Sequence, residues 1–273
     1  MKTVVVTGSF DDVRSHDLRF LEEAAQVGAL HVLLWADDVV QALTGRAPQF
    51  PEAERCYFLE AVRYVARLTL VTDRPSPDAL PSLPGVTPDV WAVRAADDTP
   101  QKRVYCATRG IAYRVFTDTE LAGFPDDAGG KMQEAGGKKK ALVTGCYDWL
   151  HSGHVRFFEE AATLGDLYVV VGNDANVTLL KGAGHPLLTQ DERRYVVESI
   201  RYVTQALIST GSGWMDAAPE IARLRPDIYA VNEDGDKPEK RAFCAEHGLE
   251  YVVLKRLPKA GLPRRTSTDL RGF

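Results

Sequence analysis

Short apolar runs alternate along this chain with longer stretches in which apolar residues recur at helical spacing. The apolar runs stand at residues 4–7, 31–35, 141–144 and 167–171. The amphipathic stretches cover residues 18–27, 52–65, 155–164 and 190–203. Runs of the first kind are typical of buried strands, and stretches of the second kind predict helices that pack on a sheet. The alternation therefore predicts an α/β fold, with a parallel sheet covered by helices on both faces.

The whole pattern occurs twice, because residues 2–124 and 139–273 align almost from end to end. The clearest matches pair residues 8–11 with 145–148, 19–25 with 156–162, 60–65 with 198–203, and 88–93 with 226–231. Between the copies lies a stretch rich in glycine and charge, which is typical of a flexible linker. We expect one domain at residues 1–125, a linker at 126–138 and a second domain at 139–273.

Composition and charge narrow the class of protein. The chain has 273 residues, of which 45% are hydrophobic and 26% charged, as in globular domains. Its net charge of −5 gives no general attraction to nucleic acid or to an anionic membrane. No apolar run approaches the roughly 20 residues that a membrane helix needs. We therefore expect a cytoplasmic protein with a small-molecule ligand, whose four scattered cysteines are reduced thiols.

Residues 145–154 carry the most specific chemistry. They read Gly-Cys-Tyr-Asp-Trp-Leu-His-Ser-Gly-His and stand between an apolar run and a helical pattern. We expect His151 just before the helix and His154 in its first turn, so that both imidazoles and the N–H groups of the helix start converge on one anion. This arrangement suits a phosphate group. A zinc site is the alternative for two histidines three residues apart, but no further ligand pattern accompanies them.

The two copies differ where this phosphate chemistry is expected. The positions of His151, Gly153 and His154 hold Arg14, His16 and Asp17 in the first copy. A carboxylate at the last of these positions would repel a phosphate. Further segments exclusive to the second copy are Lys181-Gly182, Asn232-Glu233-Asp234 and the tail at residues 264–268. Residues that both copies share, such as Lys102 and Lys240, are expected to serve packing or solvation. We therefore expect the second copy to carry the activity and the first to be a structural or regulatory partner.

The second copy resembles the cytidylyltransferases of the H-x-G-H nucleotidyltransferase superfamily, above all those that act on glycerol 3-phosphate and phosphoethanolamine. It resembles adenylyltransferases of the same fold almost as closely. The resemblance rests on residues 145–154, on Asp191-Glu192-Arg193-Arg194 before residues 199–203, and on Ser267-Thr268. It implies two tandem Rossmann-like nucleotidyltransferase domains, each with a doubly wound parallel sheet, of which the first is degenerate.

The resemblance also implies a reaction, in which a phosphate oxygen of an acceptor attacks the α-phosphorus of a nucleoside triphosphate and pyrophosphate leaves. CTP is the first expectation for the nucleotide and ATP the second. The acceptor is expected to be a small phosphorylated alcohol or a sugar phosphate. Mg²⁺ is expected to arrive with the triphosphate, so the protein need not hold a metal site of its own.

The same resemblance assigns roles to individual residues. The expected catalytic residues are His151, His154 and Lys181. Lys181 and Arg201 are expected to bind the acceptor. The expected nucleotide-binding residues are Gly145, Cys146, Tyr147, Asp148, Gly153, Glu233, Asp234, Arg265, Ser267 and Thr268.

Each of these assignments has an ordinary structural alternative. Lys181 would then be a solvated loop lysine, and Arg201 would belong to a structural salt bridge. Residues 233–234 would form a solvated acidic loop, and Ser267 would be a plain helix N-cap. Departures from the family pattern, such as Ala183 in place of a second lysine, leave the acceptor and the choice between CTP and ATP open.

Two functions of other classes also stay open. A non-catalytic nucleotide sensor would bind its ligand and report it through the packing of the two halves. A zinc-dependent hydrolase would contain stoichiometric metal. Because relatives of this fold commonly dimerise, we also expect the halves to pair within one chain as a pseudo-dimer, and homo-oligomers stay open as well.

Overall fold

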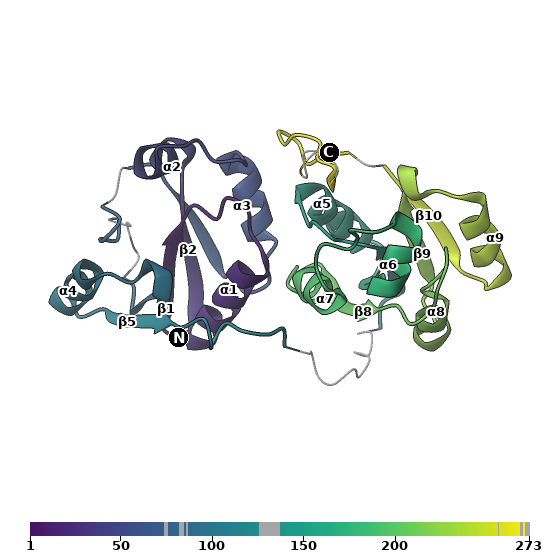
Figure 1. Ribbon diagram of the computed structural model, residues 1–273, viewed down its shortest axis with the longest axis horizontal. Helices are drawn as coiled ribbons and strands as arrows, with labels where there is room; N and C mark the ends of the chain where they lie inside the picture. Colours follow the sequence, from purple (N-terminus) through teal and green to yellow (C-terminus); the bar gives the residue numbers. More distant parts are fainter. Residues whose placement is uncertain are drawn as a thin grey trace. The chain divides into compact units, whose positions relative to one another are not determined.

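Each half of the chain builds a five-stranded sheet in which every strand runs parallel to its neighbours (Figure 1). The computed structural model describes residues 1–73, 76–81, 85, 87–125, 137–255, 257–267 and 270. It divides into two units, Met1–Gly123 and Phe124–Phe273. The expected linker at 126–138 lies outside the described residues except for its last two positions. None of the described helices is long and apolar enough to cross a membrane.

Helices and strands alternate in both units. The N-terminal unit contains β1 (Thr3–Gly8), α1 (Ser15–Val27), β2 (Ala29–Trp35), α2 (Asp37–Thr44), α3 (Glu52–Glu60), β3 (Arg67–Val71), β4 (Val90–Arg94), η1 (Ala95–Asp97), α4 (Pro100–Arg109) and β5 (Ala112–Phe116). The C-terminal unit contains β6 (Lys140–Gly145), α5 (Ser152–Ala161), β7 (Asp166–Val171), α6 (Asp174–Lys181), α7 (Gln190–Glu198), β8 (Val203–Ile208), α8 (Ala218–Leu224), β9 (Ile228–Asn232), η3 (Glu233–Gly235), α9 (Pro238–Glu246) and β10 (Glu250–Leu254).

The two sheets have the same topology. The first has the strand order β3-β2-β1-β4-β5, and the second has the equivalent order β8-β7-β6-β9-β10. In each sheet the direction of strand addition reverses beside the central strand, between β1 and β4 and between β6 and β9. Such a reversal leaves a crevice at the carboxyl ends of the two strands, where ligands of this fold class bind. The α/β fold expected from the sequence is confirmed.

The sheet of the C-terminal unit is buried on both faces. On one face, Leu142 and Tyr168 are fully buried and pack with Ile221 of α8 and Cys244 of α9. Because side chains alternate along a strand, the neighbouring strand residues point to the other face, where α5 and α7 lie. This packing fixes the starts of the helices relative to the strand ends. All four cysteines are free thiols, as expected.

Two helices are shorter than predicted, and two short helices fill segments that were expected to be loops. Helix α7 ends at Glu198 and β8 already begins at Val203, so residues 199–202 form the turn between them. Ile200 and Val203 fit a helical spacing, but they are buried in that turn and strand instead. Likewise, α3 ends at Glu60 rather than at residue 65. Helices α2 and α6 are the additions, and α6 carries Lys181 at its last position.

Candidate functional site

The turn after β6 is shaped by a glycine and a tyrosine. Tyr147 has a φ of 53°, which folds its ring back over Gly145 at the strand end. A Cβ atom at residue 145 would lie 2.7 Å from Cζ of that ring, so the position requires glycine. The Tyr147 ring also meets the ring of His154 edge-on, with centroids 5.3 Å apart. The strand end and the start of α5 are therefore held together through one aromatic side chain.

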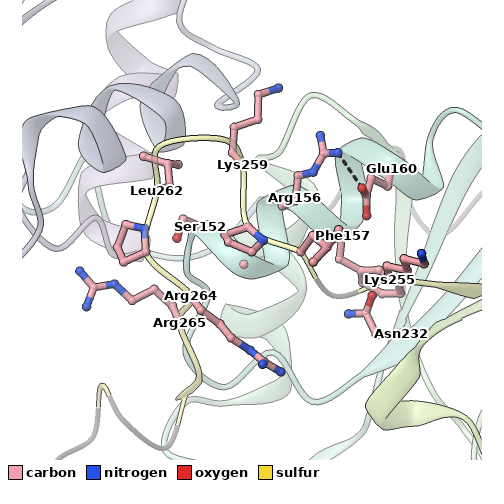
Figure 2. Close-up of a pocket in the computed structure, with 14 residues that line it drawn as sticks. Ser152, Arg156, Phe157, Glu160, Asn232, Lys255, Lys259, Leu262, Arg264 and Arg265 are labelled. Atoms are coloured by element: carbon pink, nitrogen blue, oxygen red, sulfur yellow. Dashed lines mark hydrogen bonds and ion pairs between the residues drawn. The ribbon is translucent and has the colours of Figure 1, made fainter.

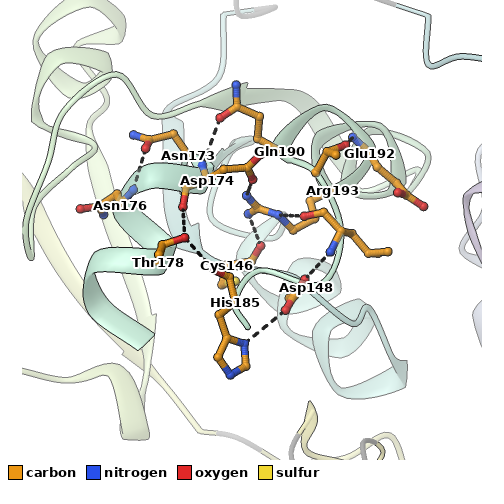
Figure 3. A network of polar contacts seen from close by, with 12 residues as sticks. Cys146, Asp148, Asn173, Asp174, Asn176, Thr178, His185, Gln190, Glu192 and Arg193 are labelled. Atoms are coloured by element: carbon orange, nitrogen blue, oxygen red, sulfur yellow. Dashed lines mark hydrogen bonds and ion pairs between the residues drawn. The ribbon is translucent and has the colours of Figure 1, made fainter. Parts of the chain in front are cut away.

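The next residue, Asp148, braces the loop before α7. Its Oδ1 accepts hydrogen bonds from the N–H groups of Leu187 (2.7 Å) and Leu188 (3.0 Å), and the residue is 3% exposed. Its Oδ2 lies 3.7 Å from Nδ1 of His185 (Figure 3). Asp148 thus connects the turn after β6 to the segment between α6 and α7.

Arg193 joins three segments that together form the framework of the site: the turn after β6, the loop before α7 and the start of α6. Its side chain is fully buried, and it donates hydrogen bonds to the carbonyl of Cys146 (2.7 Å) and to the carbonyl of Leu188 (3.0 Å). It also pairs with the carboxylate of Asp174 at 2.7 Å (Figure 3). A buried guanidinium needs this full set of acceptors, because an unpaired charge in the interior is costly. Arg193 therefore fixes the strand-end turn, the loop before α7 and the start of α6 relative to one another.

The two histidines lie where the sequence predicts them. His151 is the N-cap of α5, and its Nδ1 accepts a hydrogen bond from the N–H of Gly153 at 3.1 Å. His154 stands in the first turn of α5, with its ring centroid 4.0 Å from that of His151. A Cβ at residue 153 would lie 2.9 Å from the His151 ring, which explains the glycine between the histidines. His151 is 3% exposed, so it supports the helix start while His154 reaches the surface in front of it.

A cavity of about 560 Å³ opens at the carboxyl ends of β6 and β9, at the reversal of the strand order. It brings together most of the residues predicted for the site. Those that line it are Gly145, Cys146, Tyr147, Asp148, Gly153, His154, Lys181, Asp234 and Ser267. The hydroxyl of Ser267 donates to the carbonyl of Trp149 at 3.4 Å, which ties the tail to the turn before α5. The cavity is large enough for a nucleotide and carries several cationic or protonatable side chains.

Other predicted residues lie apart from this cavity. Arg201 is exposed in the turn before β8, at the amino-terminal edge of the sheet, because α7 runs back from the cavity to that edge. Glu233 is exposed in η3 and does not line the cavity, although Asp234 beside it does. Thr268 lies outside the described residues. His151 stands behind His154, as described above.

Arg265 lines a second pocket, between α5 and the segment 257–265 (Figure 2). The side chain of Arg264 extends from the same segment, and Arg156 pairs with Glu160 on the helix at 2.6 Å. Gly153 lines both pockets, and the Arg265 carbonyl lies 3.4 Å from where a Cβ of Gly153 would stand. The backbone of the tail therefore reaches the start of α5, while the Arg265 side chain lines the second pocket.

The cavity also contains side chains that sequence reasoning missed. Lys240 of α9 lines it, and burial, followed by the charge of Lys237, lowers the pKa of Lys240. In the N-terminal unit the matching Lys102 instead donates to the carbonyl of Asp97 at 2.5 Å. Lys240 stands in the first turn of α9, and the sequence did not single it out because Lys102 matches it in the other copy. His185 also lines the cavity and was missed, whereas Asn232, which lines it too, belongs to a segment that the sequence comparison of the two copies singles out.

Comparison with known proteins agrees with this geometry. Residues 142–251 match the model of a family described as cytidylyltransferase-like. The FAD synthase of Aciduliprofundum boonei is 36% identical over 136 residues, which cover 49% of this chain and 84% of that protein. The FAD synthase of Ferroglobus placidus is 38% identical over 120 residues, covering 43% of this chain and 75% of that protein. The bifunctional protein HldE of Azotobacter vinelandii is 37% identical over 139 residues, or 49% of this chain and 27% of that protein.

These similarities cover most of the length of the FAD synthases. The matched family segment contains the turn after β6, both histidines and every residue that lines the cavity except Ser267. The chain therefore belongs to the cytidylyltransferase-like family, and it is a nucleotidyltransferase.

Proposed function

We propose that the C-terminal unit transfers AMP from ATP to a small phosphorylated acceptor and releases pyrophosphate. CTP is the first expectation from the sequence motifs, and ATP is the second. The relatives favour the second, because two of them are FAD synthases and FAD is FMN joined to AMP. The proposal rests on one observation, the cavity at the reversal of the strand order. His154, Lys181 and Ser267 line this cavity together with Gly145 of the turn after β6.

The described side chains suit this reaction. An acceptor phosphate oxygen forms a bond to the α-phosphorus as the bond between that phosphorus and the bridging oxygen to the β-phosphate breaks. Negative charge grows on the oxygens around the reacting phosphorus and on the leaving pyrophosphate, so catalysis depends on positioning and on nearby positive charge. The start of α5 contributes the positive end of its dipole, and His154 adds a donor there. Lys181, exposed on the cavity wall, contributes a mobile cation.

Mg²⁺ would reach the site with the triphosphate and neutralise part of its charge. The exposed carboxylate of Asp234 is the acidic group on the cavity wall that suits a hard cation. Asp148, by contrast, already accepts two backbone N–H groups and serves the framework. Among the described residues, no group of three or more His, Cys, Asp or Glu side chains could hold a metal ion.

The N-terminal unit is proposed to be a structural or regulatory partner with a degenerate site. Its sheet has the same strand order, and its Arg55 contacts the carbonyls of Ser9 and Phe50 and the carboxylate of Asp37. These contacts correspond to those of Arg193, so the framework is shared between the units. Pairing of the halves as a pseudo-dimer stays a prediction.

A pyrophosphate-release assay tests the proposal. The full chain is incubated with Mg²⁺ and either ATP or CTP, against a panel of FMN, sugar 1-phosphates and glycerol 3-phosphate. We expect turnover with ATP on at least one acceptor, and a loss of about a hundredfold to a thousandfold in kcat for His154→Ala. His247→Ala is the matched control, because His247 is exposed on Phe243 of α9.

Three results would count against parts of this proposal. Higher turnover with CTP than with ATP would restore the first expectation for the nucleotide. An unchanged rate for His154→Ala would remove that residue from the reaction. Tight binding of ATP in titration calorimetry without turnover on any acceptor would favour the nucleotide sensor instead.

A further inference from the structure

His185 lies in the same cavity as His154 and Lys181, although no sequence motif points to it. It stands in the loop between α6 and α7, and its side chain is 28% exposed. Its carbonyl accepts a hydrogen bond from the Thr178 hydroxyl at 2.7 Å, which holds this part of the loop against α6. The backbone around the ring is thus fixed on the side of α6 (Figure 3).

Asp148 lies beside the ring of His185. Its Oδ1 is occupied by two backbone N–H groups, and its Oδ2 faces Nδ1 of the imidazole at 3.7 Å. A buried carboxylate beside Nδ1 favours a proton on that nitrogen, and the other nitrogen, Nε2, is then directed away from the carboxylate. Figure 3 shows the ring extending from the framework, away from Arg193 and the start of α6.

The N-terminal unit shows that the loop does not need this histidine. There Asp11 accepts hydrogen bonds from the N–H groups of Gln49 (2.7 Å, at Oδ2) and Phe50 (2.9 Å, at Oδ1), whereas Asp148 accepts both of its N–H groups at Oδ1 and keeps Oδ2 facing His185. The loop between α2 and α3 contains no histidine, yet the carboxylate braces it. Bracing therefore belongs to the shared framework, and His185 is an addition of the unit that has the cavity.

We propose that His185 binds the phosphate of the acceptor, with Nδ1–H directed at Asp148 and Nε2–H directed into the cavity. The proposal rests on the proposed function. In an in-line transfer the attacking oxygen and the leaving pyrophosphate stand on opposite sides of the α-phosphorus. Pyrophosphate is held by the start of α5 and by Ser267, so the acceptor phosphate approaches from another wall. Lys181 and His185 come from α6 and its loop, which form such a wall.

Several charged or titratable groups lie near His185 in the cavity. Asp148 faces Nδ1 of His185, and the cavity also contains His154, Lys181, Asp234 and Lys240. A phosphate dianion bound beside His185 accepts a hydrogen bond from Nε2–H and so changes the environment of the ring. A histidine that only supports the loop would show no such response to phosphate.

Ring ¹⁵N–¹H NMR of the full chain measures this response directly. The chain has six histidines, and His185→Gln assigns the His185 signal. The nucleotide site is filled with Mg²⁺ and α,β-methylene-ATP, and inorganic phosphate is then added as the probe of the acceptor site. We expect a proton on Nδ1 of His185, and we expect its ring signals to shift when phosphate is added. The signal of His247 should not change.

Two different failures are distinguishable in this experiment. If the His154 signal does not respond to α,β-methylene-ATP, the proposed function fails. If His154 responds but the His185 ring signals stay unchanged when phosphate is added, the present inference fails while the proposed function stands.

Kinetics give a second, independent test. With the acceptor found in the pyrophosphate assay, His185→Ala should raise the acceptor KM about tenfold or more and leave the KM for ATP unchanged. His185→Lys should restore the acceptor KM and remove its rise at pH values above the imidazole pKa, because lysine keeps its charge. A lysine variant as weak as the alanine variant, or an alanine variant with an unchanged acceptor KM, would overturn the assignment.

Discussion

Arg94 pairs with Asp17 at 2.7 Å in the N-terminal unit. Arg94 is the last residue of β4 and Asp17 the third residue of α1, which are the positions of Asn232 and His154 in the C-terminal unit. The first unit therefore has an internal ion pair where the second has an imidazole and an amide at its cavity. The pair satisfies both charges within the unit, and the carboxylate opposes phosphate binding there.

We expect this ion pair to affect stability but not turnover. The two side chains are 30% and 20% exposed, so Arg94→Ala or Asp17→Asn should lower the free energy of unfolding by about 1 kcal/mol or less. Chemical denaturation of both single variants and the double variant measures the coupling between the two side chains. Pyrophosphate release should equal that of the wild type. A large loss of turnover in either variant would show that the N-terminal unit contributes to the reaction.

His151 caps α5, and two substitutions can separate this structural role from the chemical role proposed for it. His151→Ala removes the acceptor of the Gly153 N–H and should cost about 1 kcal/mol of unfolding free energy. His151→Asn keeps an acceptor at the N-cap, so it should be nearly as stable as the wild type. Both variants lose the ring beside His154, and both should have lower kcat. Full activity in a stable His151→Asn variant would limit His151 to helix capping.

Gly145→Ala should disturb both the fold and the reaction. The new Cβ would stand 2.7 Å from Cζ of Tyr147, so the ring that contacts His154 must move. We expect a loss of about 1–3 kcal/mol in unfolding free energy and a lower kcat. Gly8→Ala is the matched control, because its Cβ would lie 3.1 Å from the Phe10 ring in the other unit. It should cost less stability and leave kcat unchanged, and equal effects of the two substitutions would contradict this account.

Lys240 should show a conflict between stability and binding. Its pKa is lowered in the folded chain, mainly by burial, so the unfolded chain binds the proton more readily and the charge opposes folding at neutral pH. Lys240→Met should therefore raise the free energy of unfolding near neutral pH, and its advantage should shrink as the pH rises towards the ordinary lysine value of 10.5. Denaturation across that pH range measures this trend, and the KM for ATP should rise.

Lys102→Met provides the comparison for Lys240. Lys102 donates to the Asp97 carbonyl, so its loss should lower the free energy of unfolding rather than raise it. A Lys240→Met variant that is less stable than the wild type at neutral pH would show that the charge of Lys240 is well compensated in the cavity.

Much of this molecule is predictable from its sequence because local signals agree with the fold. The apolar runs give the strands that flank the site, and the repeat gives two sheets of one topology. The position of His151 before α5 follows from a strand, a glycine and a helical pattern in succession. These features depend on neighbouring residues, so periodicity and turn chemistry are sufficient to find them.

Other features depend on packing between distant residues. Helix α6 has eight residues, too few for a clear period, and its N-cap is Asn173, whose side chain accepts the N–H of Asn176. Lys102 and Lys240 occupy matching positions, yet one meets a carbonyl and the other a cavity. His185 reaches the site because Asp148, 37 residues earlier in the numbering, lies beside it in space. No local pattern in the sequence contains these relationships.

The buried guanidinium of Arg193 has one wider consequence. Arg55 has an equivalent set of partners in the other unit, where Arg14 and Asp17 stand at the positions of the two histidines. Architecture and reactivity are thus encoded by different residues of the same fold. A protein engineer who exchanged only the reactive positions, beginning with Asp17 and Arg94, would start from an intact scaffold on which to build a second active centre.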